Sequence, residues 1–352
     1  MTLAVNDDYN ITIGPLTDKH FNWLAERSYA GYVLFADTNT AELCLPRLRA
    51  ALPAATPVIV APEGEPNKHL GTCQDLWRQL FEHGVGRRWC AICLGGGVLE
   101  DMAGFVASTY KRGIDFLQIP TTLLSMVDSS VGGKLGIDFH EVKNSIGVFN
   151  NPIAVWIDPA FLQTLPPREV RSGYAEIVKH ALIADRSQWD RLLKVTDLTA
   201  VDWTTVIPAS VDIKRKIVLE DPFEKGLRKA LNFGHTIGHA IESYWLDTDQ
   251  RLLHGEAIAA GMIAEAWLST QLNDLPAEEL EQITAYLLKI YGFQAIPAAA
   301  FPALIDLMKQ DKKNEDHRIN FTLLRRAGEA VVNETATPEQ IIAALEYYNQ
   351  LQ

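Results

Sequence analysis

The run Trp89-Cys-Ala-Ile-Cys-Leu-Gly-Gly-Gly97 decides the fold class of this chain. Its apolar residues predict a buried strand, and three glycines at the strand end allow positive φ and close approach of a ligand to the backbone. If a helix follows, its N-terminal N–H groups suit a pyrophosphate, although a tight turn explains one such cluster equally well. A second cluster, Gly132-Gly-Lys134, is followed by Lys143-Asn144. Together they favour a nucleotide site that adjoins a site for an anionic substrate.

Strand and helix patterns alternate around this run. The apolar stretches predict strands at 31–36, 57–61, 89–94, 116–119 and 153–157, and helices at about 41–51, at about 68–83 and after Gly97. This spacing predicts a mainly parallel sheet with helices on both faces, in which ligands bind beyond the carboxyl ends of the strands. Asp37, Glu65 and Gly95–Gly97 lie just past predicted strand ends. For the two acids, a solvated loop charge is the alternative interpretation.

The second half of the chain has a helical pattern. We expect a Rossmann-like nucleotide-binding α/β domain over residues 1–164 and a mostly α-helical domain over residues 165–352. The only strand predicted in the second domain lies at about 319–324. The helices are predicted at about 169–185, 203–220, 234–246, 254–272, 277–291, 301–309 and 337–348.

Composition excludes several classes of protein. The 352 residues carry a formal charge of −12, which argues against a general nucleic-acid binder but not against a basic pocket. No apolar run reaches the roughly 18 residues of a membrane helix, and residues 1–10 do not resemble a signal peptide. Cys90 and Cys93 have redox or zinc spacing, but they lie in a predicted buried strand. We therefore interpret them as core residues of a cytoplasmic protein.

A second group of candidate site residues lies in the helical half of the chain. His235 and His239 are four residues apart, so they share one helix face, and His254 opens the next helix. With Glu176, two of these imidazoles supply the ligand types of a catalytic zinc site with an open fourth position. Each histidine alone is better explained as a surface or capping residue. The glycines around the pair indicate close backbone packing, which favours a site.

These motifs resemble those of the 3-dehydroquinate synthase family, within the sugar phosphate cyclases. The resemblance implies a cytoplasmic homodimer that uses NAD and a divalent metal, zinc or cobalt. Its substrate would be 3-deoxy-D-arabino-heptulosonate 7-phosphate, an anionic sugar phosphate acid, and its products 3-dehydroquinate and phosphate. The matching segments cover nearly the whole chain: 95–101, 110–113, 120–124, 127–134, 143–144, 164–166, 175–179, 231–239, 254–256 and 311–313.

The resemblance also assigns roles to individual residues. The metal ligands would be Glu176, His235 and His254. The NAD site would use Asp37, Glu65, Lys68, Gly96, Gly97, Asp101, Thr121, Thr122, Asp128, Lys134, Lys143 and Thr164. The substrate would meet Arg112, Asp128, Lys134, Lys143, Asn144, Lys179, Lys214, Arg228, Asn232, His239 and Lys312, with Lys313 as the alternative to Lys312. The catalytic residues among these would be Lys134, Lys179, Lys214, Arg228, Asn232 and His239.

Three further points follow from the resemblance. Arg112 is expected to act on the substrate of the neighbouring subunit. Glu100 departs from the family, which often has glycine at this position, and this departure concerns cofactor affinity. Valiolone- or inosose-type cyclases and, less closely, metal-dependent glycerol or alcohol dehydrogenases are the alternatives. The residues at Asn232, His239 and Lys312 match the dehydroquinate-forming enzymes.

Overall fold

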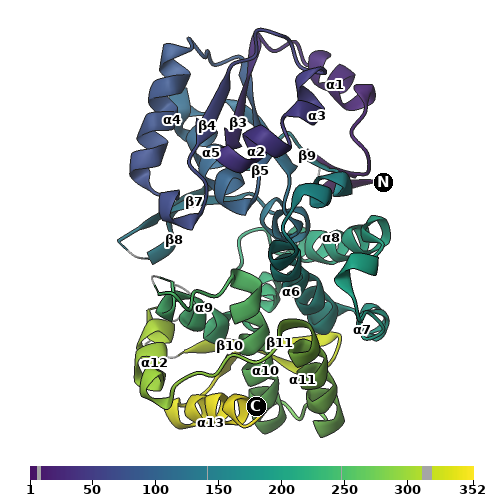
Figure 1. Ribbon diagram of the computed structural model, residues 1–352, viewed down its shortest axis with the longest axis vertical. Coiled ribbons are helices and arrows are strands. Elements are labelled where there is room, and N and C mark those ends of the chain that lie inside the picture. The colour runs from purple at the N-terminus through teal and green to yellow at the C-terminus, as the bar shows by residue number, and fades with distance from the viewer. Residues whose placement is uncertain (6–8, 141, 247, 311–318) are drawn as a thin grey trace. The chain divides into compact units, whose positions relative to one another are not determined.

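The computed structural model describes residues 1–5, 9–140, 142–246, 248–310 and 319–352, and the chain forms two compact units (Figure 1). The first unit comprises Met1–Pro166 and Trp203–Arg215, and the second comprises Pro167–Asp202 and Lys216–Gln352. The segment Trp203–Arg215, which is part of a later helix, therefore packs with the first unit. A single boundary in the sequence cannot describe this division. The division at residue 164 stays a prediction. No described helix combines the length and the apolar character needed to cross a bilayer.

A seven-stranded sheet forms the centre of the first unit, in the order β1-β2-β9-β6-β5-β3-β4. The β1–β2 pair is antiparallel and the other neighbours are parallel, which confirms the predicted α/β fold. The strands are β1 (Thr2–Val5), β2 (Tyr9–Ile13), β3 (Gly31–Asp37), β4 (Val58–Ala61), β5 (Trp89–Gly95), β6 (Asp115–Pro120) and β9 (Ala154–Ile157).

The strand order indicates where a ligand would bind, at the carboxyl ends of β3 and β5. The chain moves from β3 to the edge strand β4 and then returns to β5, on the other side of β3. Connections beyond β3 and β5 therefore run in opposite directions. In doubly wound sheets, the crevice at the carboxyl ends of two such strands is where ligands bind.

Helices and a hairpin cover the sheet of the first unit. Its helices are α1 (Asp18–Ala25), α2 (Thr38–Leu43), α3 (Pro46–Arg49), α4 (Leu70–Glu82) and α5 (Gly97–Thr109), and the hairpin is β7 (Lys134–Phe139) with β8 (Val142–Phe149). Side chains of β3, β5, α4, α5 and β7 share one buried cluster, which includes Cys73 and Cys93. All four cysteines are buried and unpaired, so the prediction of core cysteines is confirmed. The helix predicted at 41–51 is divided at Leu45-Pro46, because proline has no N–H to continue the helical hydrogen bonds.

The second unit is mainly helical. Its central helix, α10 (His254–Leu272), is buried around most of its circumference and packs against α6, α9, α11 and α13 (Figure 1). A helix that is apolar on all sides lies inside a protein rather than at its surface. The other elements are α6 (Pro167–Ala184), α7 (Arg186–Leu192), the end of α8 (Trp203–Glu220), α9 (His235–Tyr244), α11 (Ala277–Tyr291), α12 (Phe301–Lys309), α13 (Pro338–Asn349), β10 (Asn320–Arg326) and β11 (Glu329–Thr335). The prediction of a single strand was wrong, because the chain turns at Gly328 and β11 pairs with β10.

Candidate functional site

The predicted glycine loop joins β5 to α5 at the crevice described above. Gly95 ends β5, and its carbonyl accepts the N–H of Thr121 at 2.9 Å, which ties the loop to the end of β6. A Cβ at Gly96 would lie only 2.8 Å from Cγ2 of Thr122, and Gly97 is similarly crowded. No side chain among the described residues caps the first turn of α5. Its N–H groups can therefore receive a pyrophosphate.

Asp37 lies across the same crevice, at the end of β3. Its Oδ1 accepts the N–H of Thr40 at 2.8 Å and so caps α2. Because β3 and β5 are adjacent, this carboxylate and the glycine loop flank one position. Thr164 is connected to the end of α2, where its Oγ1 lies 3.8 Å from Sγ of Cys44.

A buried ion pair gathers several of the predicted residues in the first unit. The side chain of Lys68 is only 4% exposed and donates to Asp101 Oδ2 at 2.7 Å and to Asn144 Oδ1 at 2.6 Å. Burial lowers the pKa of Lys68, but Asp101 and Glu65 outweigh burial and raise it. Nζ of Lys143 lies 3.7 Å from Oε1 of Glu65. The structure therefore brings these five predicted residues together.

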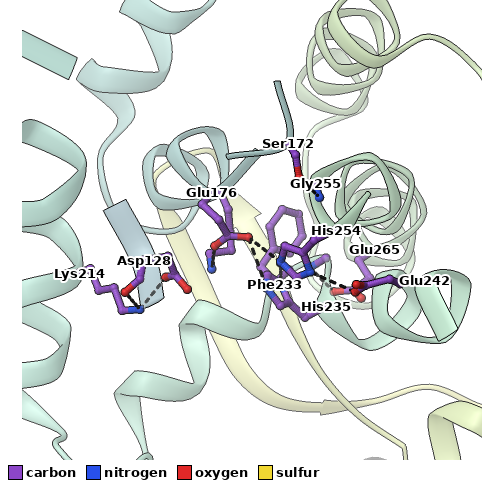
Figure 2. A network of polar contacts seen from close by, with 12 residues as sticks. Asp128, Ser172, Glu176, Lys214, Phe233, His235, Glu242, His254, Gly255 and Glu265 are labelled. Atoms are coloured by element: carbon purple, nitrogen blue, oxygen red, sulfur yellow. Dashed lines mark hydrogen bonds and ion pairs between the residues drawn. The ribbon is translucent and has the colours of Figure 1, made fainter. Parts of the chain in front are cut away.

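Asp128 belongs to a π-helical turn, Ser125–Ser129, a distortion often found at functional sites. Nζ of Lys214 donates to the Asp128 carbonyl at 2.6 Å and to its Oδ1 at 2.7 Å (Figure 2). Both residues belong to the first unit, since Lys214 lies in the part of α8 that packs there. Lys134 is exposed at the start of β7.

Arg112 is not brought to these residues. It follows the C-terminal end of α5, whereas the glycine loop precedes its N-terminal end. Thirteen helical residues at about 1.5 Å each separate the two by roughly 20 Å. Arg112 is exposed, and Lys111 and Arg112 have φ of 51° and 70°, a left-handed conformation that costs energy in residues other than glycine. Backbone strain of this kind is frequent at functional positions.

The predicted metal ligands converge from three helices of the second unit. Glu176 lies in α6, and His235 and His254 are the first residues of α9 and α10. Nε2 of His235 lies 3.4 Å from Oε1 of Glu176, and Nε2 of His254 lies 3.5 Å from the same oxygen (Figure 2). Ligand atoms about 2.1 Å from a tetrahedral zinc lie about 3.4 Å apart. These separations therefore fit such an ion.

Glycines allow the three helices to approach this closely. A Cβ at Gly255 would collide with the carbonyl of Ser172 in α6, and one at Gly238 would lie 3.0 Å from Cα of Ile258 in α10. Helix α10 thus packs backbone to backbone against both α6 and α9. The close packing that the glycine pattern predicted around the histidines is confirmed.

The Nδ1 atoms of the two imidazoles have partners of their own. Nδ1 of His235 lies 3.0 Å from the Phe233 carbonyl, and Nδ1 of His254 lies 3.1 Å from Oε2 of Glu242. When each Nδ1–H donates to these oxygens, each Nε2 keeps its lone pair for a metal. These partners therefore favour, for both rings, the orientation and the neutral tautomer that a metal ligand requires.

The charge around the imidazoles favours a cation. Burial lowers the pKa of His254, but the carboxylates of Glu242 and Glu176 outweigh burial and raise the pKa to about 10. Lys179, only 1% exposed, donates to Oε2 of Glu176, so that Oε1 faces the histidines. A divalent ion would meet the same negative charges that hold a proton on His254.

Two further predicted residues of this unit are oriented by a preceding loop. Arg228 is 1% exposed, and its Nη1 donates to the Pro222 carbonyl at 2.5 Å. Nδ2 of Asn232 donates to Oε1 of Glu224 at 3.0 Å.

His239 lies one turn beyond His235 in α9. Its ring centre is 5.0 Å from that of His235 and 5.7 Å from that of His254. The nitrogens of these three imidazoles lie within 4.8 Å of one another. Lys312 and Lys313 lie outside the described residues.

Sequence reasoning missed two acids that support the histidines. Glu242 could have been found, because it is seven residues after His235 and therefore on the same helix face. Glu265 could not have been found this way. It is fully buried in α10, and its carboxylate accepts the N–H of Gly234 at 2.6 Å and of Ile237 at 3.0 Å. It thereby anchors the N-terminal end of α9.

The sheet with its glycine loop and the helical unit with its carboxylate–imidazole cluster are arranged as in the sugar phosphate cyclases, and metal-dependent alcohol dehydrogenases share the fold alone. One solved structure of this class is 2-epi-5-epi-valiolone synthase from Streptomyces hygroscopicus subsp. jinggangensis, with NAD+ and Zn2+ bound. It is 27% identical, with 98% of this chain and 97% of that chain covered and a TM-score of 0.85. An iron-containing alcohol dehydrogenase shares the fold alone, at 14% identity, 98% coverage of each chain and a TM-score of 0.67.

Sequence comparison decides between these branches. The family models for the 3-dehydroquinate synthase N-terminal and C-terminal parts match residues 58–172 and 173–314. The 3-dehydroquinate synthase of Parabacteroides distasonis is 40% identical, with 94% of both chains covered, and that of Desulforamulus reducens is 40% identical, with 97% of both covered. This chain belongs to the 3-dehydroquinate synthase family, and it is an enzyme of that type.

Proposed function

We propose that this enzyme converts 3-deoxy-D-arabino-heptulosonate 7-phosphate to 3-dehydroquinate and phosphate, a step of the shikimate pathway. The observation that carries the proposal is the convergence of Glu176, His235 and His254 in a helical unit that also buries the cations Lys179 and Arg228. This arrangement supplies a metal position and groups for an anionic substrate. The membership of the chain in the family supports the same reaction.

Glu176, His235 and His254 would hold a zinc or cobalt ion. Such an ion, when bound, supplies a Lewis acid that polarises a secondary alcohol. The chain orients its ligands through Glu242 and the Phe233 carbonyl, which fix both imidazole rings. Lys179 holds Glu176 by its other oxygen, so that one carboxylate oxygen faces the ion.

The crevice between β3 and β5 would hold NAD, which supplies reversible hydride acceptance when bound. Gly96 and Gly97 leave space for the pyrophosphate at the start of α5, and Asp37 suits a ribose hydroxyl. The ion pair of Lys68 with Asp101 fixes the adjoining surface. The other cofactor contacts we assign are Glu65, Thr121, Thr122, Asp128, Lys134, Lys143 and Thr164.

The remaining site residues would bind the substrate. Its phosphate and carboxylate are best held by charge-assisted hydrogen bonds from lysine and arginine. We assign this work to Lys179, Lys214 and Arg228, with Asn232 completing the set and with His239 placed to exchange a proton through an imidazole nitrogen. Lys134, Lys143, Asn144 and Lys312 complete the substrate contacts that we assign.

The overall reaction involves no net oxidation. An alcohol of the substrate is oxidised, the resulting ketone acidifies the neighbouring C–H, phosphate leaves, and the ketone is reduced again. Ring opening and an intramolecular aldol closure then form the carbocycle. The protein's part is to bind the anions, hold the alcohol at the metal position and move protons.

We further propose a homodimer in which Arg112 acts on the substrate of the partner subunit. The distance of roughly 20 Å along α5 and the left-handed backbone at Arg112 support this role. Mixing Arg112→Ala chains with Lys179→Ala chains should restore part of the activity, because one of the two sites in each mixed dimer then contains both Arg112 and Lys179. With subunit exchange demonstrated, a mixture as inactive as its parents would contradict sharing. We expect a cytoplasmic enzyme, consistent with four unpaired cysteines.

Substrate selectivity tests the proposed reaction against the other cyclases. A site that buries Arg228 disfavours a substrate lacking an anionic partner for its cations. We therefore expect turnover of the heptulosonate phosphate and little of sedoheptulose 7-phosphate or glucose 6-phosphate. Comparable rates on all three would refute the substrate assignment while leaving the family unchanged.

A further inference from the structure

A pocket in the second unit has no part in the proposed reaction. It has a volume of about 280 Å³ and lies where the start of α6, one face of α10, the end of α11 and the end of α13 meet. A pocket of this volume suits a small molecule, since it lies near the lower limit for ligand pockets.

One end of this pocket carries excess positive charge. Arg168 makes a double contact with Glu256, from Nε at 2.8 Å and from Nη2 at 2.7 Å, and Arg171 donates from Nη2 to the same carboxylate at 3.2 Å. Two guanidinium groups thus share one carboxylate. The side chains of Arg168 and Arg171 are partly exposed, so an oxyanion can pair with this excess charge.

One side of the pocket is apolar. Ala259, Ala260 and Ile263 follow one another on a single face of α10, and Leu287 and Phe293 lie opposite, on and after α11. Charged groups that face an apolar surface across a small cavity suit an amphipathic small molecule.

The charged end is linked to the metal position through Glu256. Its Oε2 also accepts the N–H of Leu253 at 2.8 Å, which closes the N-terminal cap of α10. The first residue of that helix is His254. A ligand that competes for Arg171 therefore acts on the carboxylate that holds the helix end beside His254.

We propose that this pocket binds a small organic monoanion, a carboxylate on a compact apolar body, and that its occupation alters the metal position through Glu256 and the start of α10. The ligand class follows from the paired arginines and the apolar wall. The inference goes beyond the proposed function, because binding can be measured without substrate.

The test is a calorimetric titration of the metal-loaded protein with benzoate and with benzamide, its neutral counterpart. Benzoate should bind at one site and at least about tenfold more tightly than benzamide, since the arginines recognise charge. Arg171→Gln should weaken benzoate binding about tenfold, and Ala260→Leu, which fills the cavity, should abolish it. Arg191→Gln, at an exposed arginine of α7, is the matched control and should change nothing.

Two results would overturn the proposal. One is absence of saturable benzoate binding to the unaltered protein. The other is binding that persists in both Arg171→Gln and Ala260→Leu, since the anion would then occupy the substrate site or the surface; melting temperatures would show that both variants fold. For the linkage, saturating benzoate should change the rate of metal transfer to a chelator at least about twofold in the unaltered protein and not in Ala260→Leu. An unchanged rate would contradict the linkage.

Discussion

Replacing Glu265 with alanine should weaken both the second unit and its hold on a metal. The carboxylate accepts two N–H groups from the first turn of the helix that begins at His235. Hydrogen bonds to a charged group contribute about 1.5–3 kcal/mol each, so the two together contribute about 3–6 kcal/mol. The lower value applies if water enters the space that the side chain leaves. Because His235 moves with the helix end, we expect metal affinity to fall about 10- to 100-fold, as for other residues that orient metal ligands.

Two measurements check this prediction: the free energy of unfolding in denaturant, and metal affinity by competition with a chelator. Glu265→Gln should recover only part of the loss, since its amide NH2 faces one of the two N–H groups. Glu281→Ala, at an exposed glutamate of α11, is the matched control and should stay within about 0.5 kcal/mol of the unaltered protein. The reasoning is refuted if Glu265→Ala matches this control in both measurements.

Three more predictions concern the cofactor loop, a buried acid and the metal. Gly96→Ala should weaken NAD binding at least about tenfold by calorimetry, because its Cβ meets Thr122, whereas Gly86→Ala, with its nearest atom 3.5 Å away, should not; equal affinities would contradict the loop assignment. Burial, with the charge of Asp101, raises the pKa of Glu100 well above 4.5, and neither of its oxygens accepts a hydrogen bond from a described residue. The folded protein therefore keeps a proton that the unfolded chain releases, so Glu100 destabilises the fold increasingly as the pH rises above about 4.5. Glu100→Gln should raise the melting temperature more at about pH 8 than at about pH 5, and a pH-independent effect would contradict this. Chelation should abolish activity, zinc or cobalt should restore it, and Glu242→Ala should lower metal affinity about 10- to 100-fold in chelator competition; full activity without metal would contradict the assignment.

The sequence predicts the long helices well because their periodicity and their ends are both strong signals. The ranges 203–220, 254–272, 277–291 and 301–309 agree with the helices of the structure. At α11, for example, Pro276 precedes the first turn and Gly292 follows the last, so that both ends are marked by residue type. The parallel strands β3, β4, β5, β6 and β9 were predicted because each is a short apolar run between turn residues, whereas β2 was not predicted.

The hairpins could not be predicted in the same way. Strand β11 is at most partly buried along its length and has an apolar run of only three residues, Ala330–Val332, so that its pairing with β10 defines it. Strand β1 likewise depends on β2, which in turn pairs with β9, more than 140 residues later in the chain. Pairings of this kind are a property of the assembled sheet, and local residue patterns do not encode them.

Some residues of the candidate site could likewise be predicted from the sequence, and others could not. Glu176 and the three histidines were sufficient to predict a metal site, because they supply the ligand types of catalytic zinc. The choice of His235 and His254 over His239 came from the resemblance to the family. The role of Glu265 depends on how α10 packs against α9, and only the structure contains that information. The buried position of Glu100 was also hidden, since a glutamate near the start of a helix is normally expected at the surface.

The central claim is that this enzyme is a cyclase that uses NAD without consuming it. Its most direct test follows phosphate release and NADH absorbance together, with the metal-loaded enzyme, the heptulosonate phosphate and a small amount of NAD. The account predicts many molecules of phosphate for each NAD present and no accumulation of NADH during steady turnover. NADH formed in proportion to substrate consumed, with no phosphate released, would contradict it and would identify a dehydrogenase instead.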